Sequence, residues 1–239
     1  MPGGANGIGL STVQSLSGAG AKVIFGDFDS KAGEKAASEL SNATFVQTDV
    51  SKYADNIRLF KTALEKYGRV DHAIACAGVI EKGKWFDAEL TVEGVDECET
   101  TQVLDVNFLG VMYFARIAAV YLRHGRTQEG REDKSITLIA SAAGFRDSPG
   151  LFMYQCSKHA VMGLLRTTRK ILFERDGIRV NAICPAIVDT QMTSAIIESF
   201  KQTNQAINSP EDVARYILGM TVAREMVGKA VYGSLFSIP

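Results

Sequence analysis

The chain has 239 residues, of which 46% are hydrophobic and 22% charged, and this composition excludes an intrinsically disordered protein. No linker rich in proline, serine or glycine divides it, so we expect residues 1–239 to form a single domain. The 26 basic residues nearly balance the 27 acidic ones, which leaves no basic surface to hold a nucleic-acid backbone.

The four cysteines, Cys76, Cys98, Cys156 and Cys184, form no Cys-x-x-Cys pair, and the chain has only three histidines. This spacing predicts no metal site and is typical of reduced thiols in the cytoplasm. No apolar run approaches the ~20 residues of a membrane-spanning helix, and the N-terminus begins with glycines rather than with a signal peptide. We therefore expect a cytoplasmic protein without a membrane partner.

Short apolar runs alternate with stretches of helical spacing along the chain. Because these runs are apolar at consecutive positions, they are typical of strands covered on both faces, and the pattern predicts an α/β fold with a doubly wound parallel sheet. The expected strands are residues 21–25, 43–47, 70–75, 135–140, 178–184 and 229–233. The expected helices are residues 7–16, 31–40, 55–67, 103–122 and 154–174, with one more after the N-cap Ser209, and residues 124–134 are an expected loop.

The first helix is preceded by a glycine-rich turn, Gly3-Gly4-Ala5-Asn6-Gly7-Ile8-Gly9. Glycines let backbone N–H groups approach a pyrophosphate at a helix N-terminus, although a flexible loop is an alternative. Asp27 lies eighteen residues after Gly9, near the offset at which a carboxylate binds the ribose hydroxyls of a dinucleotide and repels a 2′-phosphate. The alternative for Asp27 is a turn acid that caps the next helix, a task equally open to Asp29 or Ser30.

Tyr154 and Lys158 lie four residues apart at the start of a helix, so both project from one face. A lysine cation beside a phenol favours the phenolate, which makes tyrosine usable as an acid or base near neutral pH. Ser141 ends a strand at the carboxyl edge of the sheet, where its hydroxyl either reaches a substrate oxygen or caps its own turn. Asn107 lies in an apolar helix and is either functional or a hydrogen-bonded core amide.

A second segment at the carboxyl edge runs from Asn181 to Thr190 and is interrupted by Pro185. Residues 191–206 follow it and mix apolar with polar side chains, as in a mobile helix over a pocket or an ordinary amphipathic surface helix. The apolar side chains that flank the candidate site are Phe145, Met153, Met192 and Ile196. We therefore expect a mainly apolar pocket.

Taken together, these motifs have the order and spacing found in the short-chain dehydrogenase/reductase family, which the sequence resembles over nearly its whole length. The matching residues are the glycine turn 3–9, Asp27, Asp49-Val50, Cys76-Ala77-Gly78, Asn107, Ser141, Tyr154 with Lys158, and Pro185 to Thr190. Within the family the chain is similar to NAD-dependent secondary-alcohol dehydrogenases, such as 15-hydroxyprostaglandin dehydrogenases and fungal secondary-metabolite alcohol dehydrogenases. The resemblance implies a Rossmann-type oxidoreductase that forms a homodimer or homotetramer.

The resemblance also implies the role of each site residue. Tyr154 would be the base in oxidation and the acid in reduction, and Ser141 would hydrogen-bond the same substrate oxygen. Lys158 would hold the nicotinamide ribose, and Asn107 would hold a water that links Lys158 to solvent. The residues expected to bind NAD are Gly3, Asn6, Gly7, Ile8, Gly9, Asp27, Phe28, Asp49 and Val50 (both at adenine), Cys76, Lys158, Pro185, and Val188 and Thr190 (both at the carboxamide).

Three features depart from the family pattern. Cys76 stands where an asparagine that braces the adenine side is usual, and Ala186 follows Pro185 where glycine is usual. The family's first strand and the threonine after it are missing, with Pro2 at that place. Because that strand would be central, its absence would leave buried backbone groups without partners. We therefore expect a truncated form of a longer protein, which binds NAD poorly or is unstable.

The leading hypothesis is hydride transfer between NAD and an apolar secondary alcohol or ketone, with no other partner than this substrate. The alternatives are an NADPH-dependent ketoreductase, which Asp27 disfavours, and a non-catalytic relic of the fold, which the missing strand favours. Helices 103–122 and 154–174 are apolar around much of their circumference, which predicts that they form the interface of a homo-oligomer. The residues behind this prediction are Val111, Met112, Tyr113, Phe114, Ile117, Val161, Met162, Leu164 and Leu165.

Overall fold

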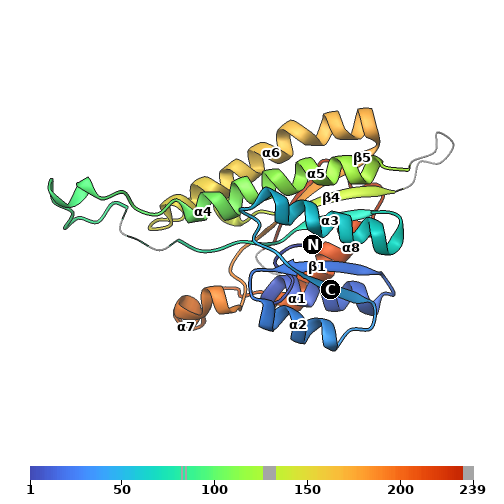
Figure 1. Cartoon of the computed structure of the whole chain (residues 1–239). Helices are drawn as coiled ribbons and strands as arrows, with labels where there is room; N and C mark the ends of the chain where they lie inside the picture. Colours follow the sequence, from blue (N-terminus) through green and yellow to red (C-terminus); the bar gives the residue numbers. More distant parts are fainter. Residues whose placement is uncertain (82, 84, 126–132, 234–239) are drawn as a thin grey trace.

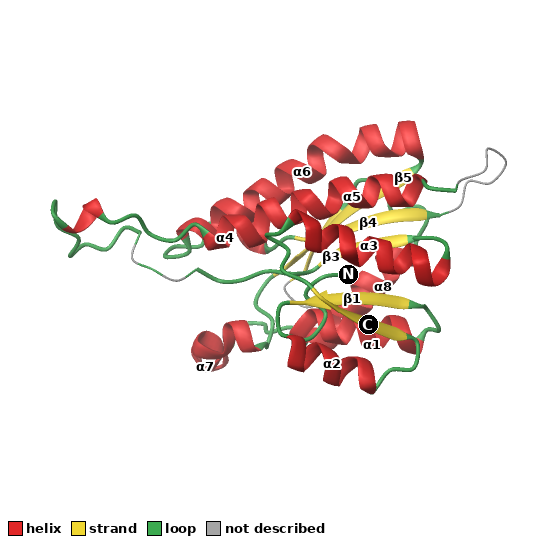
Figure 2. Ribbon diagram, viewed as in Figure 1, coloured by secondary structure: helices red, strands yellow, loops and turns green. Residues whose placement is uncertain are grey.

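Parallel strands and intervening helices make up the protein in a computed structural model that describes residues 1–81, 83, 85–125 and 133–233 (Figures 1 and 2). The strands are β1 (Val23–Asp27), β2 (Ala43–Gln47), β3 (His72–Ala75), β4 (Lys134–Ile139), β5 (Ile178–Pro185) and β6 (Ala230–Gly233). The helices are α1 (Gly7–Gly18), α2 (Ser30–Ser38), α3 (Tyr53–Tyr67), α4 (Gln102–Leu104), α5 (Val111–Arg123), α6 (Phe152–Asp176), α7 (Ser194–Gln202) and α8 (Pro210–Val222). Single helical turns cover Gly94–Asp96, Asp105–Gly110, Ala142–Gly144 and Gln191–Thr193.

Each strand expected from the sequence is present, with ends that differ by at most two residues. The expected loop 124–134 differs at its end, because Lys134 begins β4 and is 2% exposed. Its ammonium donates to the carbonyl of Val70 and to Asp71, which accounts for a charged residue inside a buried strand. Residues 126–132 of that loop lie outside the described residues. Ser209 caps α8 as expected, in a capping box with Asp212.

The sheet is divided into two parts, β1-β2 and β3-β4-β5-β6, and within the described residues no backbone hydrogen bond joins β1 to β3. This division confirms that the first strand is lacking. The chain start nevertheless lies beside β1: the Met1 amine donates to the carbonyl of Ile24 (2.7 Å), the Gly26 N–H to the carbonyl of Met1 (2.9 Å), and the Gly4 N–H to the carbonyl of Gly26 (3.0 Å). The expectation that this edge of β1 has no backbone partner is therefore wrong for residues 24–26.

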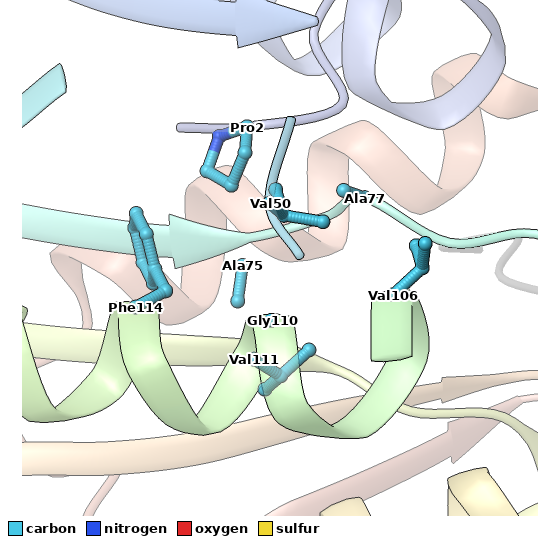
Figure 3. Close-up of a pocket in the computed structure, with 8 residues that line it drawn as sticks. All are labelled: Pro2, Val50, Ala75, Ala77, Val106, Gly110, Val111 and Phe114. Carbon is cyan, nitrogen blue, oxygen red and sulfur yellow. The ribbon is translucent and has the colours of Figure 1, made fainter. Parts of the chain in front are cut away.

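Apolar side chains close the space between the two parts of the sheet. One buried cluster includes Ile24 of β1, Ala73 of β3, and Phe60 and Phe114 from the helices above them. An apolar gap at the end of this space is too narrow for a water molecule (Figure 3). It is lined by Pro2, Val50, Ala75, Ala77, Val106, Gly110, Val111 and Phe114. Side-chain packing therefore links the parts that backbone hydrogen bonds leave separate.

The expected helix 103–122 is present but contains one π-helical turn, Asp105–Gly110, between α4 and α5. The segment Gln102–Arg123 is long and apolar enough to cross a membrane, so our expectation that no apolar run has that length is wrong. Half of its most apolar window is buried, and Ala118 and Leu122 pack in the core. Core helices of soluble proteins also have this property.

We predict that adding about ten upstream residues, an apolar strand followed by threonine, will raise the melting temperature and the affinity for NAD.

Burial lowers the pKa of the Met1 amine from 8.0 to about 5, so protonation favours the unfolded chain. The free energy of unfolding of the chain as given should therefore rise as the pH increases from about 5 to 8.0. Denaturant titrations at several pH values should show this dependence, and the extended chain should lack it.

A Gly/Ser extension of the same length is the matched control. It moves the terminal amine away from the buried position at Met1 but supplies no apolar strand. It should abolish the pH dependence without the gain in melting temperature. If the chain as given is as stable and binds NAD as tightly as the strand-extended chain, the space between β1 and β3 needs no further strand.

Candidate active site

The glycine-rich turn opens directly into α1, as expected. The N-cap, Asn6, makes no side-chain cap bond and the first turn of α1 contains no acid, so the N–H groups of residues 7–9 have no acceptor among the described residues. The turn is tightly folded: a Cβ on Gly9 would lie 1.6 Å from the carbonyl oxygen of Gly3, which only glycine avoids. An uncapped helix N-terminus with free N–H groups fits the pyrophosphate of a dinucleotide.

Asp27 ends β1 and is tied to the glycine turn. Its carboxylate accepts the N–H of Ala5 (3.0 Å) and the N–H of Asp29 (3.1 Å). Asp29, not Asp27, caps α2, by accepting the N–H of Ala32 (3.0 Å). The alternative in which Asp27 caps the helix is therefore wrong. Phe28, beside it, is 75% exposed.

Tyr154 and Lys158 lie one turn apart on α6, with the Lys158 Nζ 5.5 Å from the centre of the Tyr154 ring. Lys158 is 5% exposed, and its ammonium donates to the carbonyl of Ile139 (3.0 Å), its one acceptor among the described residues. A lysine ammonium has three N–H donors, so two are left for a ligand. The Tyr154 hydroxyl likewise has no hydrogen-bond partner in the described part of the chain. A buried ammonium with spare donors fits the ribose hydroxyls of a nicotinamide cofactor.

Ser141 follows β4 and caps the turn Ala142–Gly144, because its Oγ accepts the N–H of Ala143 (3.2 Å). This contact uses the oxygen as acceptor and leaves the hydroxyl proton for another partner. The turn packs against α6: a Cβ on Gly144 would lie 2.9 Å from the carbonyl oxygen of Lys158. The strand that supplies Ser141 also supplies Ile139, the acceptor for Lys158, so both groups are positioned by β4.

Asn107 is fully buried in the π-helical turn. Its Oδ1 accepts the N–H of Val79 (2.8 Å), and its Nδ2 donates to the carbonyl of Val79 (2.9 Å) and to the Oγ of Ser157 (3.2 Å). It is thus a hydrogen-bonded core amide, and it also borders the site. A Cβ on Gly78 would lie 3.4 Å from the Asn107 Oδ1 and 3.7 Å from the Lys158 Nζ.

The residues expected at adenine lie in the turn after β2. The Asp49 carboxylate accepts the N–H (3.0 Å) and the hydroxyl (2.6 Å) of Ser51, and Val50 is 7% exposed. Burial raises the pKa of the Cys76 thiol to about 12 and that of Cys184 to about 11, while the nearby Lys158 cation acts in the opposite direction. Both side chains therefore stay protonated beside Lys158 near neutral pH.

The loop after β5 meets the glycine turn. A Cβ on Gly7 would lie 3.1 Å from the Thr190 Cγ2, and the N–H of Thr190 donates to the Thr193 hydroxyl (3.1 Å). Val188 is buried and forms a parallel bridge with Asn208. Pro185 ends β5, upstream of this loop. Chain segments that follow β1 and β5 thus lie beside the start of α1, on the side of the molecule where α7 lies (Figure 1).

Two polar residues at this site were not singled out from the sequence. The Glu81 Oε2 accepts the backbone N–H of Tyr154 (2.8 Å), and the Ser157 hydroxyl donates to the carbonyl of Tyr154 (2.6 Å). Ser157 directly precedes Lys158 in the sequence, and this position could have indicated that it lies at the site. Glu81 lies in a loop without periodicity, so no spacing rule points to it.

The doubly wound sheet brings together a glycine turn, an acid at the end of the next strand, and a Tyr-Lys pair. This combination defines the fold and site of a nicotinamide-dependent oxidoreductase. The profile described as "short chain dehydrogenase" matches residues 1–200. A short-chain dehydrogenase/reductase of Penicillium roqueforti is 30% identical over 234 residues, which are 98% of this chain and 67% of the relative. A 3-alpha-(or 20-beta)-hydroxysteroid dehydrogenase of Mycobacterium bovis is 35% identical over 204 residues, 85% of this chain and 73% of the relative.

A solved structure supports the same fold. The crystal structure of a 3-ketoacyl-(acyl-carrier-protein) reductase from Brucella melitensis, complexed with NADH, superposes with a TM-score of 0.84 over 97% of this chain and 93% of that one, at 24% identity. The chain therefore belongs to the short-chain dehydrogenase/reductase family, and its fold is of the Rossmann type, as the sequence predicts.

Proposed function

We propose that the chain transfers a hydride between NAD and an apolar secondary alcohol or ketone, with Tyr154 as general acid or base. The observation that carries this proposal is the buried Lys158 ammonium, which lies 5.5 Å from the Tyr154 ring centre and keeps N–H donors for a ligand. A bound nicotinamide ring would supply the hydride acceptor or donor. Family membership supports the reaction class.

The residues of the chain would move the proton and orient the substrate. In oxidation the substrate hydroxyl donates its proton to the Tyr154 phenolate, and in reduction the phenol returns it. The Lys158 ammonium, 5.5 Å from the centre of the Tyr154 ring, would attract the negative charge that develops on the phenol oxygen during proton transfer. The Ser141 hydroxyl donates to the substrate oxygen and fixes its direction. Asn107, which borders Lys158, would hold the water that relays the proton to solvent.

The expected pocket-lining residues support an apolar substrate. Phe145, Met192 and Ile196 are 43%, 40% and 41% exposed, so apolar surface is available in the segments that follow Ser141 and Thr190. The similarity to a hydroxysteroid dehydrogenase also supports a bulky apolar alcohol, and the fungal relative supports a role in secondary metabolism. Apolar walls with few polar groups are usual in such pockets.

We predict that Tyr154→Phe abolishes turnover but leaves NADH binding intact, whereas Lys158→Ala weakens both. The phenol acts only on the substrate proton, while the ammonium serves the ribose as well as the phenol. Turnover assays and NADH fluorescence titrations measure the two effects. The matched controls are Tyr113→Phe, on α5, and Lys170→Ala, on α6, both outside the site. Wild-type turnover in Tyr154→Phe would contradict the mechanism.

We also propose that the cofactor is NAD rather than NADP. The Asp27 carboxylate is held at the glycine turn, where a 2′-phosphate would be repelled, and the neighbouring residues Gly26, Phe28 and Asp29 include no base. The NADPH-dependent ketoreductase remains the second enzyme candidate. A chain that binds neither cofactor would instead be the non-catalytic relic, which the divided sheet favours.

We predict that Asp27→Ser combined with Phe28→Arg shifts the preference toward NADP, because repulsion is removed and a phosphate partner is supplied. Dissociation constants for NADH and NADPH, measured by fluorescence, test the shift. Phe28→Arg alone is the control that separates the two contributions. Equal affinity of the unmodified chain for both cofactors would refute the assignment of NAD.

We further propose a homodimer or homotetramer that associates through α5 and α6. Most of the apolar residues that predicted this interface are buried inside the chain, so they account for its core instead. The large apolar residues that these helices and the turn before them expose are Leu109, Met112, Val120, Phe152, Ile171 and Phe173. The free cysteines support our proposal of a cytoplasmic protein, and the shared core supports one domain over residues 1–239.

We predict that Val120→Glu, and separately Phe173→Glu, dissociates the oligomer to a monomer, because a charge is then buried without a partner. Light scattering at micromolar concentration measures the mass. Val222→Glu, at a 64% exposed residue of α8, is the matched control and should leave the mass unchanged. A monomeric mass of the unmodified chain would rule out this interface.

A further inference from the structure

We propose that Glu81 positions the reacting tyrosine through the backbone of α6, an inference that rests on the proposed function of Tyr154. The Glu81 Oε2 accepts the N–H of Tyr154 at 2.8 Å, across 73 residues of sequence. Tyr154 is the third residue of α6, so this contact fixes the turn from which its ring projects.

The start of α6 depends on this carboxylate because the helix has no local cap. The N-cap residue, Leu151, makes no side-chain hydrogen bond, and the first turn contains no acid. Helix N-terminal N–H groups need acceptors, and a carboxylate there also interacts favourably with the helix dipole. Among the described residues, Glu81 is the side chain that supplies both to Tyr154.

The carbonyl of Tyr154 is held from the same loop by a second route. It accepts from the Ser157 hydroxyl (2.6 Å), whose oxygen accepts from the Asn107 amide (3.2 Å). That amide in turn holds both the N–H and the carbonyl of Val79. The loop at residues 79–81 is therefore connected to both polar backbone groups of Tyr154.

Lys158 is fixed independently of Glu81. It lies one turn further along α6, is almost fully buried, and donates to Ile139 on β4. Loss of the Glu81 contact would therefore displace the Tyr154 ring relative to a stationary ammonium. The rate of proton transfer would fall, whereas the affinity for NADH, which depends on Lys158 and the glycine turn, would not.

The test compares Glu81→Leu, which has no acceptor, with Glu81→Gln, whose amide oxygen can still accept the Tyr154 N–H. With 2-decanol as the probe substrate, we expect Glu81→Leu to lower kcat by about 10- to 100-fold, since small displacements at a reacting centre have effects of that size. The dissociation constant for NADH should stay within about twofold of the wild-type value. Glu81→Gln should restore most of kcat.

Asp87→Leu is the matched control. The Asp87 carboxylate also accepts a backbone N–H, that of Glu89 (3.0 Å), within the same loop. This variant should keep wild-type kcat. Amide hydrogen exchange at Tyr154, followed by NMR, gives a readout that needs no turnover: the exchange rate should rise in Glu81→Leu and not in Glu81→Gln or Asp87→Leu.

Unchanged exchange at Tyr154 in Glu81→Leu would overturn the proposal, whether or not 2-decanol is a substrate. So would a fall in melting temperature and NADH affinity without a selective fall in kcat, because that result indicates only a structural contact. Wild-type turnover in Tyr154→Phe would instead refute the proposed function, and is distinguishable because exchange at residue 154 still reports the Glu81 contact.

Discussion

The site depends on a cation that is buried without an ionic partner. Burying a lysine ammonium is unfavourable unless hydrogen bonds or opposite charges compensate. Two other buried cations have such partners: Lys134 pairs with Asp71 at 2.8 Å and Arg179 with Asp133 at 2.8 Å. Lys158 has one carbonyl acceptor and no carboxylate among the described residues. The paired cations lie in the first two residues of β4 and β5 and stabilise the fold. The unpaired Lys158 lies one turn after Tyr154 on α6, and we propose that it serves the reaction.

The order of strands and helices was predictable because apolar periodicity and caps are local signals. A few neighbouring residues specify each of these elements: the consecutive apolar residues of β4 indicate a buried strand, and Ser209 indicates the start of α8. The Tyr154-Lys158 pair was predictable for the same reason, since a spacing of four residues places both on one face of a helix. Their proximity in the structure follows directly from that spacing.

Contacts between distant segments were not predictable in this way. The π-helical turn at Asn107 depends on the backbone of Val79, and a Cβ on Gly110 in that turn would lie 2.9 Å from the Val50 Cγ2. The Glu81 contact with Tyr154 joins two elements with no shared pattern. The pairing of residues 1–4 with β1 was likewise missed, because Met1-Pro2 alone do not read as a strand. Each of these features is set by tertiary contacts, which a single sequence does not display.

The cysteines differ in chemical reactivity according to where they lie. Thiolates, not thiols, react with electrophiles and peroxides, and burial raises the pKa values of Cys76 and Cys184, so both should react more slowly than the exposed thiols. Cys98 and Cys156 are exposed. Cys156 lies on the first turns of α6, two residues after Tyr154, yet on the surface. A fluorescent maleimide attached there, with Cys98 replaced by serine, would place an optical reporter on the helix that carries the tyrosine, because the Cys76 and Cys184 thiols should react more slowly.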